Sequence, residues 1–207
     1  MQIEATGIEG VLLIKPEMFS DPRGVFLEVF SQPAFTEAAG HRLTVDQVNC
    51  STSRRGTVRG LHAVAPPPGQ ARYVTCVGGA VLDIVVDIRV GSPTFGETFS
   101  AVLDEDARHA LYLAEGLAHG FAPLTGQATV VYLCSSVYSA AKTIDIHPLD
   151  PDLALDWRQS DPVLSDKDRA APGLREAAAR GLLPDYAECR ARYELLRRDA
   201  AATGGPR

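Results

Sequence analysis

The sequence has 207 residues, of which 45% are apolar and 22% charged, as is ordinary for a single globular domain. Its formal net charge of −6 argues against general nucleic-acid binding, which needs a broad basic surface, but allows a small anionic ligand held by a local arginine cluster. No apolar run of about 18 residues and no basic-then-apolar N-terminus occurs, so we expect neither a membrane span nor a secretory signal. The four cysteines lack CxxC spacing, which predicts reduced thiols in a cytoplasmic protein.

Up to residue 160 the pattern is mainly that of short β-strands. Apolar or alternating runs recur between turn signals at residues 11–14, 25–30, 73–77, 81–88, 109–113 and 129–138. Many short strands at this spacing predict a sandwich or a barrel. One short helix is predicted over QPAFTEAAG (32–40), with Gly40 as its stop.

Beyond residue 160 the composition favours helices. We predict them over GLREAAARG (173–181) and over PDYAECRARYELLRRD (184–199), with Pro184 at the first helical position. The second helix carries one apolar stripe at 3-4-3 spacing, formed by Tyr186, Cys189, Tyr193 and Leu196. Such a stripe is typical of a helix that packs on a core. We therefore expect a β domain over residues 1–160 and a C-terminal helical tail of the same domain over residues 161–207.

The segment VLDIVVDIR (81–89) has two different faces when it is read as a strand. One face is wholly apolar and is expected in the core. The other carries Asp83, Asp87 and Arg89 among valines. This second face is either a solvated outer surface or the polar interior of a barrel. Similarly, the run TVVYLCSSVY (129–138) places Tyr132 and Tyr138 on one side of a strand, where buried hydroxyls would need partners.

The stretch TVRGLHAVAPPPGQARYVTC (57–76) combines one imidazole, two arginines and a rigid proline turn between strands. It is either a surface loop or the wall of an active site. In the second interpretation His62 moves protons, while Arg59 and Arg72 hold an anionic group.

Six ordered blocks of the sequence resemble the nucleotide-sugar epimerases typified by dTDP-4-dehydrorhamnose 3,5-epimerase. Together they extend over roughly residues 8–172, which makes the resemblance far more specific than any single short motif. The blocks are SDPRGVFLEVF (20–30), DQVNCSTSRRGTVRGLH (46–62), PPPGQARYVTCVGGAVLDIVVDIRVGSPTFG (66–96), EGLAHGF (115–121), TVVYLCSSVY (129–138) and LSDKDRAAP (164–172).

The resemblance implies a mainly β fold, a cupin-type jelly-roll barrel with a C-terminal helical segment, and a homodimer whose N-terminal segments cross between subunits. It also implies that the enzyme needs no cofactor and no metal. The sequence agrees, because metal-binding cupins place an HxH pair on one strand and no HxH occurs here.

The resemblance also assigns roles to individual residues. His62 looks like the general base, Asp168 like the carboxylate that orients it, and Tyr132 like the acid on the opposite face of the sugar. Arg72 falls where the family commonly has a lysine beside the developing enolate, and Asp83 looks like a supporting acid for His119. The positions that match substrate-holding residues are Phe19, Arg23, Phe26, Glu28, Gln47, Asn49, Arg59, His119 and Tyr138.

These residue types suit the implied chemistry. A 4-keto group acidifies the protons at C3 and C5 of the sugar, and a His–Asp pair supplies a base poised near neutral pH. The enolate oxygen then needs a cation or a hydrogen-bond donor. Inversion requires reprotonation from the other face, which a tyrosine hydroxyl can perform.

Two departures from the family pattern bear on specificity. Arg72 keeps the positive charge of the family's lysine but shares its protons less readily. The segment KTIDIHPLDP (142–151) has Thr143 at a position where the family has glutamate, and HPLDP where it has an Arg-Trp-Asp-Asp-Pro run. These changes and the GLLP segment (181–184) look more like the 3-epimerases of antibiotic deoxysugar pathways than like the enzymes of rhamnose synthesis.

We therefore predict an isomerase that inverts C3 of a dTDP-linked 4-keto-6-deoxyhexose, with inversion of C5 left open. The alternatives are a 3,5-epimerase of the rhamnose type, a 5-epimerase of a modified dTDP-sugar, a non-catalytic cupin that binds sugars, and a metal-dependent cupin enzyme.

Overall fold

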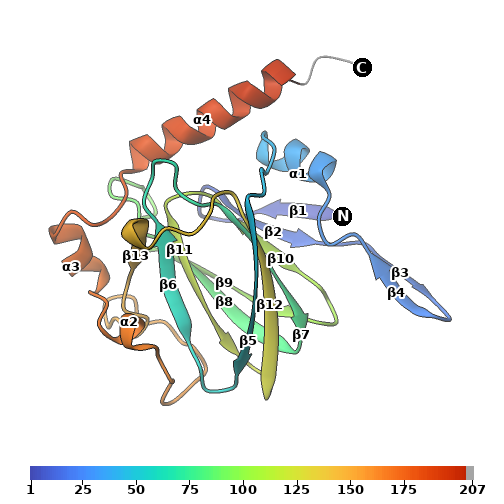
Figure 1. The fold of residues 1–207 in the computed structure, drawn as a ribbon, viewed down its shortest axis with the longest axis horizontal. Coiled ribbons are helices and arrows are strands. Elements are labelled where there is room, and N and C mark those ends of the chain that lie inside the picture. The colour runs from blue at the N-terminus through green and yellow to red at the C-terminus, as the bar shows by residue number, and fades with distance from the viewer. Residues whose placement is uncertain (204–207) are drawn as a thin grey trace.

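A computed structural model describes residues 1–203 of the chain (Figure 1). Two antiparallel sheets form the body. The larger sheet has the order β1-β2-β10-β7-β12-β5, with bounds Gln2–Ala5, Val11–Lys15, Ala110–Leu113, Arg72–Gly78, Gln127–Cys134 and Gln47–Arg54. The smaller sheet has the order β13-β6-β11-β8-β9, with bounds Thr143–Asp145, Arg59–Val64, Leu117–Pro123, Ala80–Asp87 and Thr98–Asp104.

The remaining elements lie outside these sheets. Strands β3 (Met18–Asp21) and β4 (Gly24–Leu27) form a hairpin of their own, which projects from the body in Figure 1. The helices are α1 (Gln32–Ala39), the 3-10 turn η1 (Ala140–Lys142), α2 (Asp166–Arg169), α3 (Leu174–Ala179) and α4 (Tyr186–Thr203). No helix in the described part of the chain is long and apolar enough to span a bilayer.

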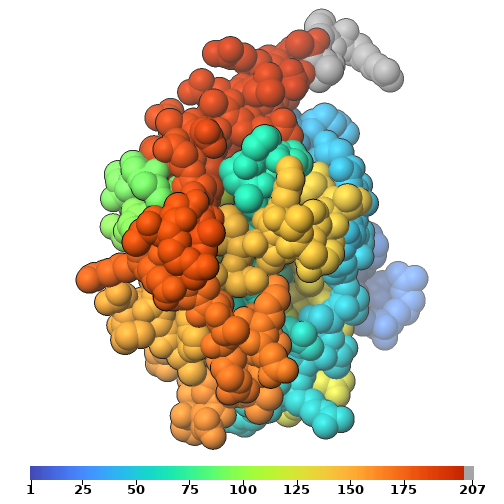
Figure 2. Space-filling view, turned by 60° about the vertical axis from the view of Figure 1, so that its left-hand side comes forward, coloured from blue at the N-terminus to red at the C-terminus, as the bar shows by residue number. Residues whose placement is uncertain are grey.

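The two faces of strand β8 pack into two different hydrophobic cores. Val81 and Val85 lie between the two sheets, in the larger core. Leu82, Ile84 and Val86 face the other way, into a second core that Trp157 and Leu174 of the C-terminal segment complete. Figure 2 shows part of this covering segment in orange, below the red helix α4.

The polar face of residues 81–89 is therefore interior, and the solvated-surface interpretation is wrong. Asp83, Asp87 and Arg89 have no exposed surface. Asp87 Oδ2 lies 2.8 Å from Arg89 Nη2, and Arg89 also donates to the hydroxyl of Tyr193 on α4. A buried ion pair of this kind is tolerated because each charge has its partner.

The predicted helices are present, with changed boundaries: α3 covers Leu174–Ala179 and α4 covers Tyr186–Thr203. Helix α1 ends at Ala39 and is capped by Gly40, the predicted stop, whose φ of 77° is the left-handed value that glycine adopts without strain. Helix α4 begins at Tyr186, so Pro184 is not its first residue. The carbonyl of Pro184 instead accepts a hydrogen bond from the amide of Val90, which fixes the approach to α4. On α4 itself Cys189 and Tyr193 are buried, as the apolar stripe predicted.

Two predicted strands are shorter than expected. β4 ends at Leu27, and the carbonyl of Val29 accepts a hydrogen bond from Tyr73 in the body rather than continuing the hairpin. β12 ends at Cys134, so Tyr138 does not belong to the strand face that carries Tyr132. Beyond that point the Ser136 hydroxyl donates to the carbonyl of Gly69, which ties the chain to the proline-containing turn before β7.

Candidate active site

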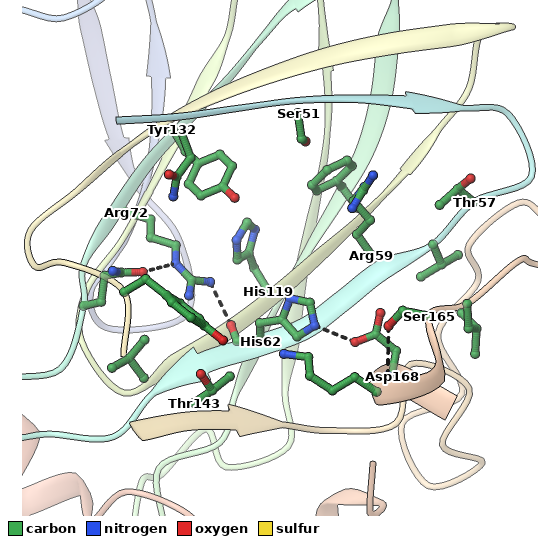
Figure 3. A pocket seen from close by; sticks show the side chains of 18 of the residues that line it. Ser51, Thr57, Arg59, His62, Arg72, His119, Tyr132, Thr143, Ser165 and Asp168 are labelled. Atoms are coloured by element: carbon green, nitrogen blue, oxygen red, sulfur yellow. Dashed lines mark hydrogen bonds and ion pairs between the residues drawn. The ribbon is translucent and has the colours of Figure 1, made fainter. Parts of the chain in front are cut away.

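A cavity of about 500 Å³ opens between the two sheets and the segment around α2 (Figure 3). Eight of the predicted site residues line it, contributed by β5, β6, β7, β11, β12 and the segments after β12. They are Asn49, Arg59, His62, Arg72, His119, Tyr132, Tyr138 and Asp168. Within the described chain the stretch 57–76 is therefore a wall of this cavity rather than a surface loop.

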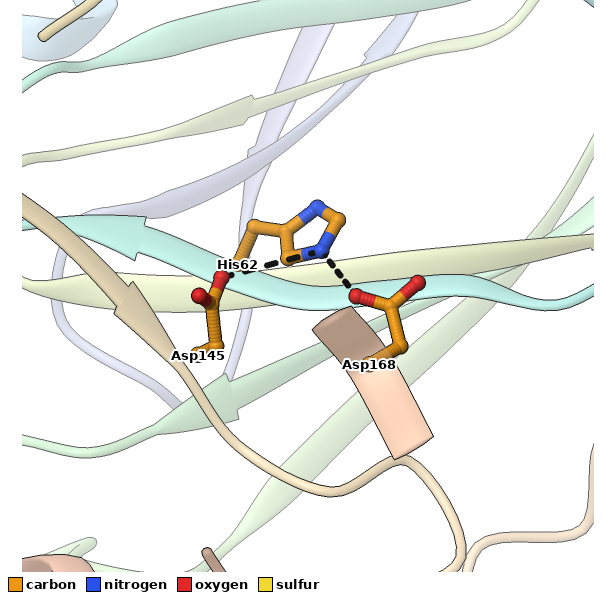
Figure 4. Close-up of side chains that lie close together, drawn as sticks. All are labelled: His62, Asp145 and Asp168. Atoms are coloured by element: carbon orange, nitrogen blue, oxygen red, sulfur yellow. Dashed lines mark hydrogen bonds and ion pairs between the residues drawn. The ribbon is translucent and has the colours of Figure 1, made fainter. Parts of the chain in front are cut away.

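The predicted contact between His62 and Asp168 is present. Nε2 of His62 on β6 lies 2.6 Å from Oδ1 of Asp168 on α2. The carboxylate is placed by its short helix, where the amide of Asp168 donates to the hydroxyl of Ser165 at the N-cap. Because Nε2 is engaged, Nδ1 is the nitrogen of His62 left to accept a proton, and it points away from the carboxylates in Figure 4.

The environment keeps Asp168 ionised. Burial alone would raise the pKa of this carboxyl group, but the hydrogen bond and the charge of His62 outweigh it and lower the pKa. A carboxylate that stays ionised stabilises the imidazolium formed when the histidine takes up a proton.

His119 lies beside His62 in the sheet, because the two residues are directly paired across β11 and β6. Its Nδ1 lies 3.3 Å from both carboxylate oxygens of Asp83, the contact that the resemblance implies. Burial lowers the pKa of His119, and Arg72 and His62 lower it further against the opposing effect of Asp83. A neutral imidazole here can accept or donate a hydrogen bond without adding a charge to the cavity.

Arg72 is a buried cation fixed on two sides. Its Nη1 donates to the backbone carbonyl of His62 at 2.9 Å, and its Nε donates to Oε1 of Gln70 at 3.0 Å. Burial lowers the pKa of the guanidinium, while Cys134 and Tyr132 are among the groups that oppose this shift. The guanidinium and the phenol of Tyr132 both line the cavity near His62 (Figure 3).

Three further predicted residues form one connected group at the rim. The side chain of Gln47 donates to Asn49 Oδ1 at 2.7 Å and accepts from the amide of Tyr138 at 2.8 Å. Asn49 and Tyr138 line the cavity, and Gln47 holds them from behind. Arg59 is oriented separately, because its Nε donates to the Ser53 hydroxyl at 2.7 Å.

Four predicted substrate residues lie elsewhere. Phe19, Arg23, Phe26 and Glu28 are on or next to the β3–β4 hairpin, and none of them lines the cavity. Arg23 pairs instead with Asp21 of the same hairpin at 2.5 Å. The structure of one chain therefore does not bring these four residues together with His62.

The structure also reveals site residues that the sequence interpretation missed. Asp145 lies on β13 directly opposite His62 of β6, and its Oδ1 is 3.8 Å from Nε2 of that histidine. Lys167 of α2 lies 2.8 Å from the same Asp145 oxygen. Gln70 orients Arg72, as described above. Asp145 is in a strand of only three residues, too short to give a periodic signal, and a single Asp–Lys pairing across 22 positions leaves no pattern in one sequence.

His62, Asp145 and Asp168 place one ligand atom each within 4.8 Å of one another, a spacing in which some proteins hold a metal ion. Their donor atoms are already engaged here. Nε2 of His62 is hydrogen-bonded to Asp168, and the Asp145 oxygen nearest His62 accepts a hydrogen bond from the ammonium of Lys167. We therefore interpret the cluster as a hydrogen-bonded pair beside an ion pair and do not assign it to a metal.

Comparison with known proteins gives a consistent result over nearly the whole chain. A family model described as dTDP-4-dehydrorhamnose 3,5-epimerase matches residues 5–176. A dTDP-4-dehydrorhamnose 3-epimerase of Streptomyces niveus is 52% identical over 92% of each chain. A dTDP-4-dehydrorhamnose 3,5-epimerase of Mycolicibacterium smegmatis is 46% identical over 96% of this chain and 98% of its own.

The crystal structure of NovW, a 4-keto-6-deoxy sugar epimerase from the novobiocin biosynthetic gene cluster of Streptomyces spheroides, is 52% identical and superimposes with a TM-score of 0.90 over 91% of this chain and 95% of its own. These matches confirm the predicted cupin-type jelly roll with its C-terminal helical segment. The chain therefore belongs to the dTDP-4-dehydrorhamnose 3,5-epimerase family.

Proposed function

We propose that this protein is an epimerase of a dTDP-linked 4-keto-6-deoxyhexose that inverts C3, acting in deoxysugar biosynthesis as the antibiotic-pathway enzymes do. The observation that carries the proposal is the cavity itself. It contains a histidine hydrogen-bonded to a buried carboxylate, a fixed guanidinium and a tyrosine from the opposite sheet.

The arrangement supports a two-step proton transfer. Nδ1 of His62 takes the proton from C3, and the electrons of the broken C–H bond move into an enolate whose oxygen is the former 4-keto oxygen. Arg72 is placed to stabilise that oxygen, an effect typically worth roughly 3–4 kcal/mol in oxyanion sites. Tyr132 then returns a proton to C3 from the other face, so that the carbon is inverted and the ketone is restored. Both groups exchange protons with solvent before the next turnover, and no cofactor is required.

The nucleotide and pyrophosphate would be held by Gln47, Asn49, Arg59, His119 and Tyr138 around the cavity. We propose that Phe19, Arg23, Phe26 and Glu28 contribute from the hairpin of a second copy, so that the active enzyme is a homodimer. An exposed hairpin with apolar side chains on both strands supports this arrangement, because such surfaces commonly mark protein contacts.

We also propose that the helical tail predicted over residues 161–207 belongs to the same domain as residues 1–160, because Asp168 completes the pair with His62. Residues 204–207 of that tail lie outside the described part of the chain. The four cysteines are free, which supports a location in the cytoplasm, where thiols stay reduced.

Proton NMR in deuterated water with dTDP-4-keto-6-deoxyglucose tests the function. We expect deuterium to enter at C3 first, with slower or no entry at C5. Equal incorporation at both carbons from the earliest times would make the protein a 3,5-epimerase, and incorporation only at C5 would favour the 5-epimerase alternative. No incorporation at either carbon, despite binding, would indicate a non-catalytic sugar-binding cupin.

Chelation separates the proposal from a metal-dependent cupin. We expect the rate of exchange to be unchanged after exhaustive dialysis against a chelator, because imidazole and guanidinium supply the base and the cation. Loss of activity that a single divalent ion restores would contradict the proposal.

A further inference from the structure

A second cavity of about 560 Å³ lies behind the wall that carries Asp145 and Lys167. Lys167 and Thr143 line both this cavity and the one that contains His62. Strand β13 and helix α2 therefore form a thin partition, with His62 on one side and solvent access on the other. The Lys167 side chain is 49% exposed and the Asp145 side chain 20% exposed, so the ion pair is reached by water while still close to the base.

Asp145 is placed by strand pairing rather than by a loop. It faces His62 directly in the β13–β6 register, and opposed residues of antiparallel strands put their side chains on the same face. Its carboxylate lies 3.8 Å from the ring nitrogen that also bonds Asp168 (Figure 4). This distance is too long for a hydrogen bond but short enough for a strong charge interaction with an imidazolium.

Lys167 weakens the electrostatic effect of the Asp145 carboxylate on His62. Its ammonium lies 2.8 Å from the Asp145 oxygen that faces His62. An ammonium at this distance neutralises part of the carboxylate's field and adds its own repulsion toward a protonated ring. Asp145 and Lys167 therefore act on His62 with opposite signs.

Other charged and titratable groups also surround His62. Cationic groups come from β6 and β7, an imidazole from β11, a phenol from β12, and an acid and a cation from α2. They are Arg59, Arg72, His119, Tyr132, Asp168 and Lys167. With Arg72 bonded to its backbone carbonyl, His62 takes up its proton in a cavity already rich in positive charge, and one carboxylate, Asp168, is in direct contact.

We propose that the Asp145–Lys167 ion pair is a positioning device that sets the pH range in which His62 acts as a base. The inference rests on the proposed role of His62. Asp145 supplies a second negative charge that favours the protonated ring beside Arg72, and the ammonium of Lys167 opposes this effect. Neither side chain needs to touch the sugar.

The two charges predict opposite responses. Asp145→Asn replaces the carboxylate with a neutral amide of the same shape. The imidazolium then loses stabilisation, so His62 should become protonated only at lower pH. Lys167→Met keeps the aliphatic stem and removes the cation, so His62 becomes protonated at higher pH. We expect each shift to be about half to one pH unit, below the roughly 1–3 units of a buried pair because water screens this one.

NMR titration of the histidine ring Cε1 protons measures this in the absence of substrate. The His62 signal is assigned by its absence in His62→Asn. Lys167→Arg keeps the cation and should restore the wild-type midpoint. Lys142→Met is the matched control, because Lys142 lines the same second cavity but donates to the carbonyl of Pro67 rather than to Asp145, and we expect no shift.

We expect the midpoint of the His62 titration to shift to lower pH in Asp145→Asn and to higher pH in Lys167→Met. The acid side of the pH profile of kcat/KM should shift in the same direction in each variant. Shifts of the same sign in both variants, or none in either, would overturn the inference. If Asp145→Asn does not fold, Lys167→Met alone decides, since its midpoint must rise. Because the titration needs no substrate, it stands even if the wild type fails to exchange deuterium, the result that would sink the proposed function alone.

Discussion

The predicted substrate residues lie in two regions, the cavity around His62 and the β3–β4 hairpin. Those in the cavity are held by neighbouring side chains, whereas those on the hairpin are exposed. In the cavity, side chains from both sheets converge and the key polar groups hold one another, as Arg72 holds the backbone of His62 and Asp168 holds its ring. On the hairpin, Phe19 and Phe26 are 52% and 67% exposed and contact no part of the cavity. Figure 1 shows the hairpin standing clear of the two sheets.

The difference teaches which part of the site one chain can build. A two-stranded hairpin is marginally stable in water, and its apolar side chains gain little unless another surface covers them. The cavity needs no such help, since its walls belong to the two sheets of the body, and strands β6 and β11 bury their other face in a core. We therefore expect the chemistry to depend on the cavity and the retention of the nucleotide to depend on a second copy.

The largest expected effect tests the cavity. His62→Asn removes the base but keeps a polar side chain of similar size, so the rate of deuterium exchange at C3 should fall at least ~10²–10⁴-fold. The fold should persist, with the thermal unfolding temperature lower by only about 3–6 °C because the contact with Asp168 is lost. Exchange at a rate close to that of the wild type would show that another group is the base.

The next effect tests the hairpin. Phe26→Asp places a charge on the apolar surface that we propose to contact a second copy, and we expect a loss of about 30-fold in kcat/KM together with dissociation of the dimer in sedimentation. Leu195→Asp is the matched control, because Leu195 is 48% exposed on α4, away from the cavity and the hairpin. A wild-type protein that is monomeric and active at low micromolar concentration would contradict the shared site.

The third prediction compares Asp168 of the cavity with Asp21 of the hairpin. The pKa of Asp168 is lowered because its contacts outweigh the effect of burial, and the pKa of Asp21 is lowered by hydrogen bonds with Arg23. A group whose folded pKa is depressed stabilises the fold above its unfolded pKa and loses that contribution as pH falls through the folded pKa. Asp168→Asn should therefore cost about 1.5 kcal/mol in unfolding free energy at pH 7, and the difference should be smaller at about pH 3, because it is lost only as pH falls through the depressed folded pKa.

Urea unfolding at both pH values measures this, with Asp21→Asn as the comparison. Asp21 lies exposed on the hairpin, and water screens its pairing with Arg23. We expect no measurable change in that variant at either pH. A pH-independent cost for Asp168→Asn would mean that its charge does not stabilise the fold.

Most of the strands and most residues of the cavity could be predicted from the sequence, for physical reasons. The strand runs are bounded by turn residues, and the polar face of residues 81–89 fits an interior as well as a surface until burial is known. Burial decided the question, since Asp83 and Asp87 have no exposed area. The contact between His62 and Asp168 spans 106 positions and was expected only through the resemblance.

The parts that could not be predicted depend on tertiary geometry. Asp145 and Lys167 become neighbours of His62 because a three-residue edge strand and a one-turn helix meet there, and neither has a periodic pattern. The sequence continues the alternation of β12 as far as Tyr138, but the strand ends at Cys134, where hydrogen bonds to the turn before β7 draw the chain away. The isolation of the hairpin is likewise invisible in a sequence.

The smallest expected effect concerns which carbon is inverted. Arg72 has a planar, multi-donor head that is already tied to the His62 carbonyl and to Gln70, so it can hold the enolate oxygen in one orientation. A lysine at this position is a point charge on a flexible stem and would let the sugar ring turn. We therefore expect Arg72→Lys to raise deuterium exchange at C5 relative to C3 by a few-fold, measured by proton NMR over time.

Gln70→Leu loosens the same guanidinium without removing its charge, so it should change the ratio in the same direction but by less. A ratio unchanged in Arg72→Lys would show that the ring's orientation is fixed elsewhere in the cavity, and Thr143, which lines it beside Tyr138, would be the next residue to exchange for the family's glutamate.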